Sequence, residues 1–118
     1  MIALNRRDYP GSTPVAESEL APITSTDAAA AVKQYLLATS VELAAFLQYA
    51  VVELGLPAIK ESHGQRSGGI ALVPWSLGNM FVISLLSNIG ELPSALAQVM
   101  RSYVKTYIAF GAQSSCAF

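Results

Sequence analysis

The stretch SVELAAFLQYAVVELGLP, residues 40–57, decides the fold because it is apolar on both sides of a predicted helix. Leucines at 36, 43, 47 and 54 and Ala50 recur at helical spacing on one face. The opposite face holds Tyr35, Glu42, Phe46, Tyr49 and Glu53. A helix that is apolar on both sides is buried on both sides, so we expect the leucine face to pack within the subunit. The face with the two glutamates is then predicted to contact a neighbouring subunit.

The signals at both ends of this helix are clear. Upstream, TSTDAAAAVKQ offers Thr26 or Asp27 as a cap, followed by four alanines. Downstream, Gly55 and Pro57 are typical of a helix end. The helix is therefore expected to contain about 28 residues and to be roughly 42 Å long.

The remaining chain divides into an arm, a polar loop and two further helices. Residues 1–25 hold three of the six prolines and are predicted to form an extended arm, which is ordered on a neighbour in an assembly. Residues 60–69 form an exposed polar loop. A helix is predicted between Pro74 and Gly90, and a last one from Pro93 to Phe110. Only GIALV, 69–73, alternates as a strand does. We predict an all-α fold, with a single helical domain over 26–118.

The last predicted helix has a buried stripe and a polar stripe. Its buried stripe comprises Leu96, Val99, Tyr103, Tyr107 and Phe110. Arg101 and Lys105 lie four residues apart on the polar side, where two like charges repel unless an anion lies over them.

Composition indicates a subunit with excess apolar surface. The 118 residues form one domain, and 53% are hydrophobic while 13% are charged. The charged fraction is roughly half that of an average soluble domain. We therefore expect part of the apolar surface to face other copies, a second homologous subunit or lipid. The net charge of −1 gives no overall attraction to nucleic acid.

Neither the cysteine nor the N-terminus indicates export. Cys116 is the only cysteine, which excludes an internal disulfide. In the N-terminal segment, Asp8, Pro10 and Pro14 stand where a signal peptide would be apolar. We expect synthesis in the cytoplasm and a final location in a virion or an extracellular filament.

The sequence predicts no catalytic, cofactor or metal site. Glu42 and Tyr49 have the E-x6-Y spacing of the first helix in ferritin-like di-iron proteins, which that helix resembles locally. Such sites need Glu-x-x-His pairs on facing helices, and the only histidine, His63, lies in the polar loop. A ferritin-like half-bundle is the weakest of the alternatives, and we expect a protein that is not an enzyme.

A membrane-embedded or pilin-like subunit is the main alternative. Residues 70–90 contain 21 residues without a charge, but Pro74 and Gly78 interrupt them. In the first helix, Glu42 and Glu53 would each cost about 2.5–3.5 kcal/mol near a bilayer centre.

Nucleic acid is a possible partner through local basic residues alone. The candidate polyanion contacts are Arg6, Arg7, Lys33, Lys60, Arg66, Arg101 and Lys105. Their significance depends on whether the fold brings them to one surface.

The segment NIGELPSALAQVMRSYVKTYIAF, residues 88–110, resembles part of the helical coat proteins of filamentous, rod-shaped archaeal viruses. The shared features are Ile89-Gly90-x-x-Pro93 before a long helix, the aromatic end from Tyr103 to Tyr107, and Ala109-Phe110. The resemblance covers about a fifth of the chain and implies an arm followed by helices that pack between subunits around DNA. Those coats are basic, whereas this chain is not. We predict a self-assembling structural subunit, in the first place a virion coat protein, whose two helix glutamates pair with Arg101, Lys105 or tyrosine hydroxyls of a neighbour.

Overall fold

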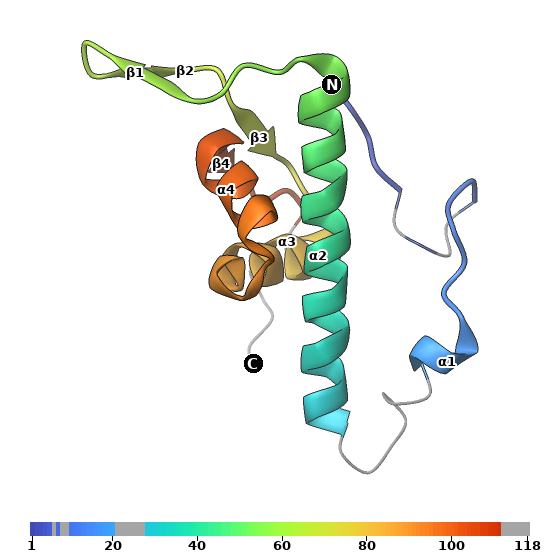
Figure 1. Cartoon of the computed structure of the whole chain (residues 1–118). Coiled ribbons are helices and arrows are strands. Elements are labelled where there is room, and N and C mark those ends of the chain that lie inside the picture. The colour runs from blue at the N-terminus through green and yellow to red at the C-terminus, as the bar shows by residue number, and fades with distance from the viewer. Residues whose placement is uncertain (6, 8–9, 21–27, 112–118) are drawn as a thin grey trace. The chain divides into compact units, whose positions relative to one another are not determined.

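The computed structural model describes residues 1–5, 7, 10–20 and 28–111. It divides into two compact units, Met1–Tyr35 and Leu36–Phe118. The first unit contains the arm, with the single-turn helix α1 (Glu17–Leu20), and the start of the long helix α2 (Ala28–Leu54). The second unit contains the rest of α2 and all the elements that follow it (Figure 1). The predicted domain boundary after residue 25 stays a prediction.

Helix α2 ends at Leu54, just before Gly55, as the sequence predicted, and the backbone conformation of Gly55 explains why. Gly55 adopts φ 58°, in the left-handed region that glycine enters without steric cost. The Leu56 N–H then donates to the Val51 carbonyl at 3.2 Å, the wide closing bond of a Schellman motif. The predicted caps Thr26 and Asp27 lie outside the described residues.

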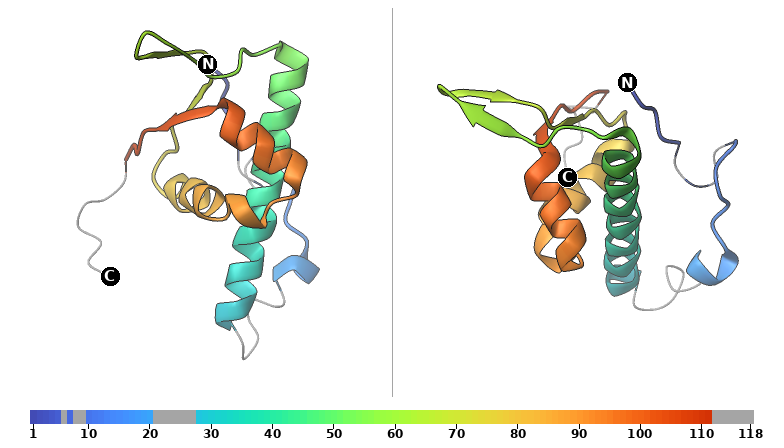
Figure 2. Two further views of the ribbon diagram at one scale, coloured as in Figure 1. Left: turned by 60° about the vertical axis from the view of Figure 1, so that its left-hand side comes forward. Right: turned by 45° about the horizontal axis from the view of Figure 1, so that its top comes forward.

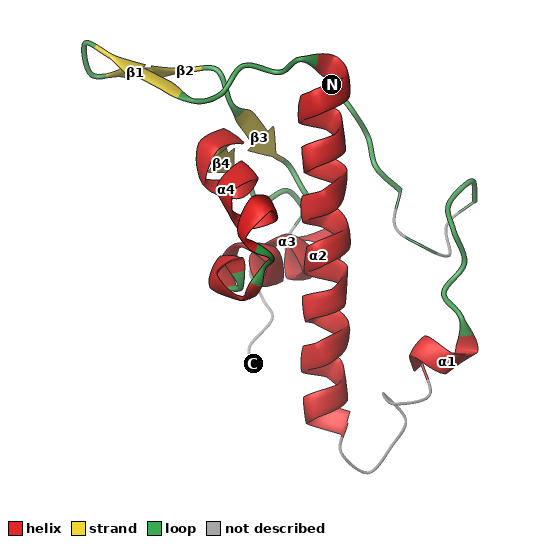
Figure 3. Cartoon of the chain, in the orientation of Figure 1, coloured by secondary structure: helices red, strands yellow, loops and turns green. Residues whose placement is uncertain are grey.

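Two shorter helices pack on α2, namely α3 (Gly78–Ser87) and α4 (Ser94–Tyr103), with the 3₁₀ turn η2 (Ile89–Glu91) between them (Figure 3). Ala44 and Leu47 of α2 meet Leu85 of α3 in one core cluster, which is completed by Leu92, Leu96, Ala97 and Met100. Leu47 and Ala50 are buried and Leu43 is half-buried, which confirms that this face packs within the unit, although Leu54 at the helix end is 56% exposed.

Small side chains bring α2 close to α3. Ser40 and Ala44 are both fully buried, one helical turn apart. The Ser40 hydroxyl donates to the Leu36 carbonyl at 2.8 Å and lies 3.4 Å from the Ser84 hydroxyl of α3. Side chains this small let the two helix backbones approach, and each buried hydroxyl keeps a hydrogen-bond partner.

The fold is mostly helical but α+β, so the all-α prediction is wrong in part. Strands β1 (Lys60–Ser62) and β2 (Gln65–Ser67) form an antiparallel hairpin within the predicted loop. Its two-residue turn, His63-Gly64, has positive φ at both positions, 52° and 74°, as a type I′ turn requires.

The second correction concerns the last helix, which ends at Tyr103 instead of Phe110. Residues Val104–Tyr107 form β4, which pairs in parallel with β3 (Ile70–Leu72). β-Branched and aromatic residues predominate in 104–108, and these favour a strand once a partner strand is available. β3 lies within GIALV, the one stretch with strand-like alternation, although no strand was predicted there, and Tyr107 and Phe110 leave the predicted helical stripe.

Candidate functional site

Seven large apolar side chains remain exposed in the segment that leads from the parallel sheet into α3 and in the segment paired with it. The indole of Trp75 packs against the ring of Phe110, with ring centroids 4.8 Å apart and a tilt of 56°. Trp75 nevertheless remains 67% exposed. We call this surface the Trp75 patch, and its exposed members are Val73, Trp75, Leu77, Met80, Ile83, Ile108 and Phe110.

The patch is built by strand pairing that continues beyond β3 and β4. The N–H of Ile108 donates to the Leu72 carbonyl at 2.9 Å, and that of Phe110 donates to the Pro74 carbonyl at 3.3 Å. The Ser76 N–H then donates back to the Phe110 carbonyl at 2.9 Å. Helix α3 follows at once, and exposed apolar residues recur every three positions from its N-cap onward, at Leu77, Met80 and Ile83.

A buried asparagine joins the two halves of the patch. Asn79 is 6% exposed, and its amide donates to the carbonyls of Ser76 at 2.7 Å and Phe110 at 3.1 Å. The Tyr107 hydroxyl donates to Asn79 Oδ1 at 2.7 Å. The side chain therefore ties the start of α3 to the strand that carries Phe110, and it satisfies every atom it buries.

The predicted inter-subunit face of α2 lies open along its second half. Glu42, Tyr49 and Glu53 are exposed, Tyr49 by 62%, whereas Phe46 and Tyr35 are half-buried. Val52 beside them is 69% exposed. The contact of this face with a neighbouring subunit stays a prediction.

The structure brings four of the seven candidate polyanion contacts together. The Ile59 N–H, next to Lys60, donates to the carbonyl of Ser102, next to Arg101, at 2.9 Å. Lys105 Nζ donates to the Arg66 carbonyl at 2.7 Å. We call these four residues the hairpin cations: Lys60, Arg66, Arg101 and Lys105. Arg101 and Lys105 are no longer helical neighbours, because Lys105 lies in β4.

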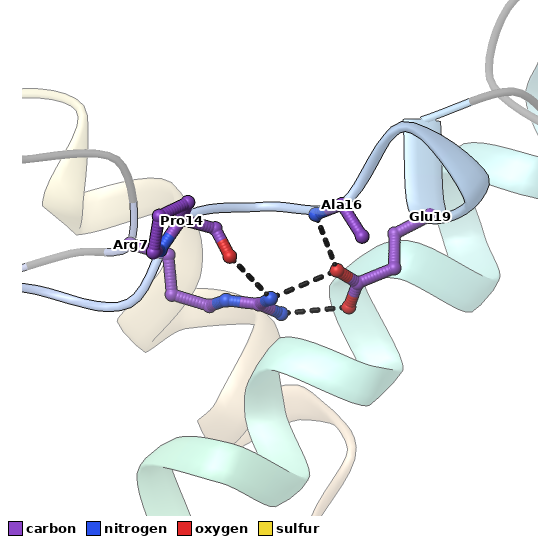
Figure 4. Close-up of polar contacts among 4 residues, drawn as sticks. All are labelled: Arg7, Pro14, Ala16 and Glu19. Atoms are coloured by element: carbon purple, nitrogen blue, oxygen red, sulfur yellow. Dashed lines mark hydrogen bonds and ion pairs between the residues drawn. The ribbon is translucent and has the colours of Figure 1, made fainter.

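The other three candidates belong to residues 1–35 and not to the unit that holds the hairpin cations. Arg7 forms a forked ion pair with Glu19 in the arm, at 2.7 and 2.8 Å, and also donates to the Pro14 carbonyl (Figure 4). Glu19 also accepts the Ala16 N–H, and these hydrogen bonds, that from Arg7 first, lower the pKa of its carboxyl. Lys33 is exposed in the first unit, and Arg6 lies outside the described residues.

Two further features of the described residues bear on metal binding and on membranes. Among those residues no group of three or more His, Cys, Asp or Glu side chains could hold a metal ion. Helix α2 is long and apolar enough, by length and composition, to cross a membrane. Of its most apolar 18-residue stretch, 28% is buried.

The Trp75 patch was missed by sequence reasoning. The sequence predicts a helix between Pro74 and Gly90 and places Phe110 in the buried stripe of the last helix. One signal in the sequence could have indicated the patch. Trp75, the only tryptophan of the chain, lies in the charge-free residues 70–90, which Pro74 and Gly78 interrupt. Comparison with known proteins gave no match among protein-family models, curated proteins or solved structures.

Proposed function

We propose that this chain is a non-enzymatic structural subunit that self-assembles into a filament or shell, in the first place a virion coat. The observation that carries the proposal is the Trp75 patch, whose seven large apolar side chains are each 45–67% exposed. Exposed apolar patches of this kind on soluble proteins are typical of interaction sites. Burial of apolar surface stabilises an interface by about 25 cal/mol per Å² before the costs of association.

A second exposed surface favours a polymer over a closed pair. Tyr49 and Val52 of α2 are more than three-fifths exposed, and they belong to a different element from the Trp75 patch. When two different surfaces of one subunit meet, the contact is heterologous and continues from copy to copy. Such a contact builds rings or open filaments, according to the rotation between subunits.

The only tryptophan makes the proposal directly testable, because it lies in the patch. Its emission is expected to move to shorter wavelengths as the protein concentration rises, together with light scattering and the appearance of regular particles in negative-stain electron microscopy. Emission and scattering that do not change up to the solubility limit would contradict self-assembly through this patch.

A matched pair of variants separates the patch from a general effect of charge. Ile83→Glu places a carboxylate on the exposed face of α3, and Ala95→Glu places one at an exposed position of α4 outside the patch. We expect Ile83→Glu to prevent assembly and Ala95→Glu to leave it intact. Both variants should keep the far-ultraviolet circular dichroism of the parent. Equal effects of the two variants would contradict the role of the patch.

A membrane-embedded subunit is the second candidate, and the length and low burial of α2 favour it. In this case the tryptophan emission would respond to detergent or lipid vesicles and not to protein concentration. Ala45→Lys would then reduce vesicle binding, because residue 45 is exposed near the middle of α2 and a lysine near the bilayer centre costs about 2.5–3.5 kcal/mol.

A further inference from the structure

The hairpin cations are every lysine and arginine of the unit Leu36–Phe118, and they gather around one hairpin. In the described residues of this unit, none of the four lies within ion-pair distance of a carboxylate. The four acidic residues of the unit are Glu42, Glu53, Glu61 and Glu91, of which only Glu61 is in the hairpin. The hairpin region is therefore cationic even though the chain has a net charge of −1.

The hairpin itself has nothing apolar to bury. Residues 60–67 are KESHGQRS, and all of them are exposed. The ribbon projects from the helices in every view (Figure 1, Figure 2). An isolated two-stranded hairpin is marginal in water, and this one is held at its base by the bonds from Ile59 to Ser102, from Gly69 to Pro57 and from Lys105 to Arg66. A polar ribbon of this kind suits a hydrated, charged partner better than a bilayer or an apolar groove.

The register places cations on both faces of the ribbon. Lys60 pairs with Ser67, and Glu61 pairs with Arg66, so Lys60 and Arg66 point to opposite faces. The major groove of B-form DNA is about 12 Å wide and admits a two-stranded ribbon between its two phosphate backbones. Lys60 is in β1 and Arg66 is in β2, so a ribbon lying in that groove would place one strand with a cation beside each wall, with Glu61 as the one acidic residue of the ribbon.

We propose that the β1–β2 hairpin binds duplex DNA through the major groove. Lys60 and Arg66 contact the two backbones, and Arg101 and Lys105 contact phosphates at the mouth of the groove. The contact is electrostatic and carries no sequence specificity of its own. It does not depend on self-assembly, since all four cations belong to one chain.

Salt dependence gives the size of the expected effect. With four phosphate contacts the logarithm of the affinity should fall with a slope of about −3.6 against the logarithm of salt concentration. This slope corresponds to roughly a 100-fold loss of affinity between about 50 and 200 mM salt. Each contact that is removed should reduce the slope by about 0.9.

The test is the fluorescence anisotropy of a short labelled DNA duplex titrated with the full chain at several salt concentrations. Protein concentrations are kept below those at which tryptophan emission changes, so that a failure of DNA binding is separate from a failure of assembly. The variants are Lys60→Gln and Arg66→Gln, both at exposed positions. Lys33→Gln is the matched control, because it removes the same charge from the other unit.

The proposal predicts that each hairpin variant lowers the slope by about 0.9 and weakens binding at low salt, while Lys33→Gln leaves the slope unchanged. It is overturned if Lys33→Gln acts as strongly as Arg66→Gln, or if the parent protein does not bind the duplex at low salt. Equal affinity for single-stranded DNA, polyglutamate or vesicles of anionic lipid would also overturn it, because none of these offers a groove lined by phosphates.

Discussion

The buried amide of Asn79 should stabilise the contact between α3 and the segment that carries Phe110 through its hydrogen bonds. Replacement by alanine removes the two hydrogen bonds that the amide donates, to the Ser76 and Phe110 carbonyls, and the one that it accepts from the Tyr107 hydroxyl. It leaves the backbone pairing of residues 72–76 with 108–110 in place. The variant therefore tests the side-chain contact separately from the sheet.

The expected loss is moderate, because two of the three partners have a second donor. The Ser76 carbonyl also accepts the N–H of residue 79 at 3.0 Å, and the Phe110 carbonyl also accepts the Ser76 N–H at 2.9 Å. Only the half-buried Tyr107 hydroxyl depends on Asn79 Oδ1. At about 0.5–1.5 kcal/mol for each net hydrogen bond, we expect Asn79→Ala to lower the free energy of unfolding by about 2 kcal/mol.

Tyr107→Phe removes the same bond from the other side. It leaves Asn79 Oδ1 buried without this donor, so we expect a loss of about 1–2 kcal/mol. The double variant should lose less than the sum of the two, with a coupling energy of about 1 kcal/mol, because both single changes break one shared bond. Tyr103→Phe is the control: no hydrogen bond of its hydroxyl is seen among the described residues, and a change within about 0.5 kcal/mol is expected.

Urea denaturation followed by tryptophan emission and by circular dichroism measures the parent and the four variants. Trp75 lies next to the contact, so its emission reports on the local structure, while dichroism reports on the helices. If the free-energy losses of the two single variants add within about 0.3 kcal/mol, Asn79 and Tyr107 do not interact, and the proposed stabilising contact is refuted.

Three other predictions test the arm, the base of the hairpin and the helix contact. Glu19 has a lowered pKa, so its ion pair with Arg7 should be complete above the ordinary value of 4.5 and should be lost as the pH falls through the lowered pKa. Titration of the Glu19 carboxyl by nuclear magnetic resonance measures this pKa. A pKa that is not lowered in the parent, or one that stays the same in Arg7→Gln, would contradict the prediction. Gly69→Ala should destabilise by about 1–3 kcal/mol, since φ is 78° and a Cβ would lie 2.9 Å from the Tyr103 carbonyl oxygen, whereas Gly90→Ala meets no atom within 4 Å and should be neutral in thermal melts. Ala44→Leu should destabilise by about 1–3 kcal/mol in urea, because Ala44 is fully buried, and an unchanged midpoint would show that the helices are not closely packed.

The sequence by itself determined those features that depend on neighbouring residues. The end of α2 follows from Gly55, whose left-handed backbone and following hydrogen bond need no distant partner. The start of α4 after Pro93 is equally local. The leucine face of α2 could be identified because helical periodicity is a property of the sequence alone.

The hairpin turn was within reach of local reasoning but was missed. His63-Gly64 supplies the two positive φ values of a type I′ turn, and glycine at the second position is the usual signal. The flanking residues are polar throughout, so no alternation of apolar and polar positions marked the strands.

Only the tertiary structure decided the state of residues 104–110 and the position of the charges. This segment continues a helix without a glycine or proline to stop it, and it becomes a strand because β3, far away in the sequence, pairs with it. That pairing creates the Trp75 patch and brings Lys105 to the Arg66 carbonyl. Contacts between distant segments leave no periodic trace in the sequence, so both candidate surfaces depended on the fold.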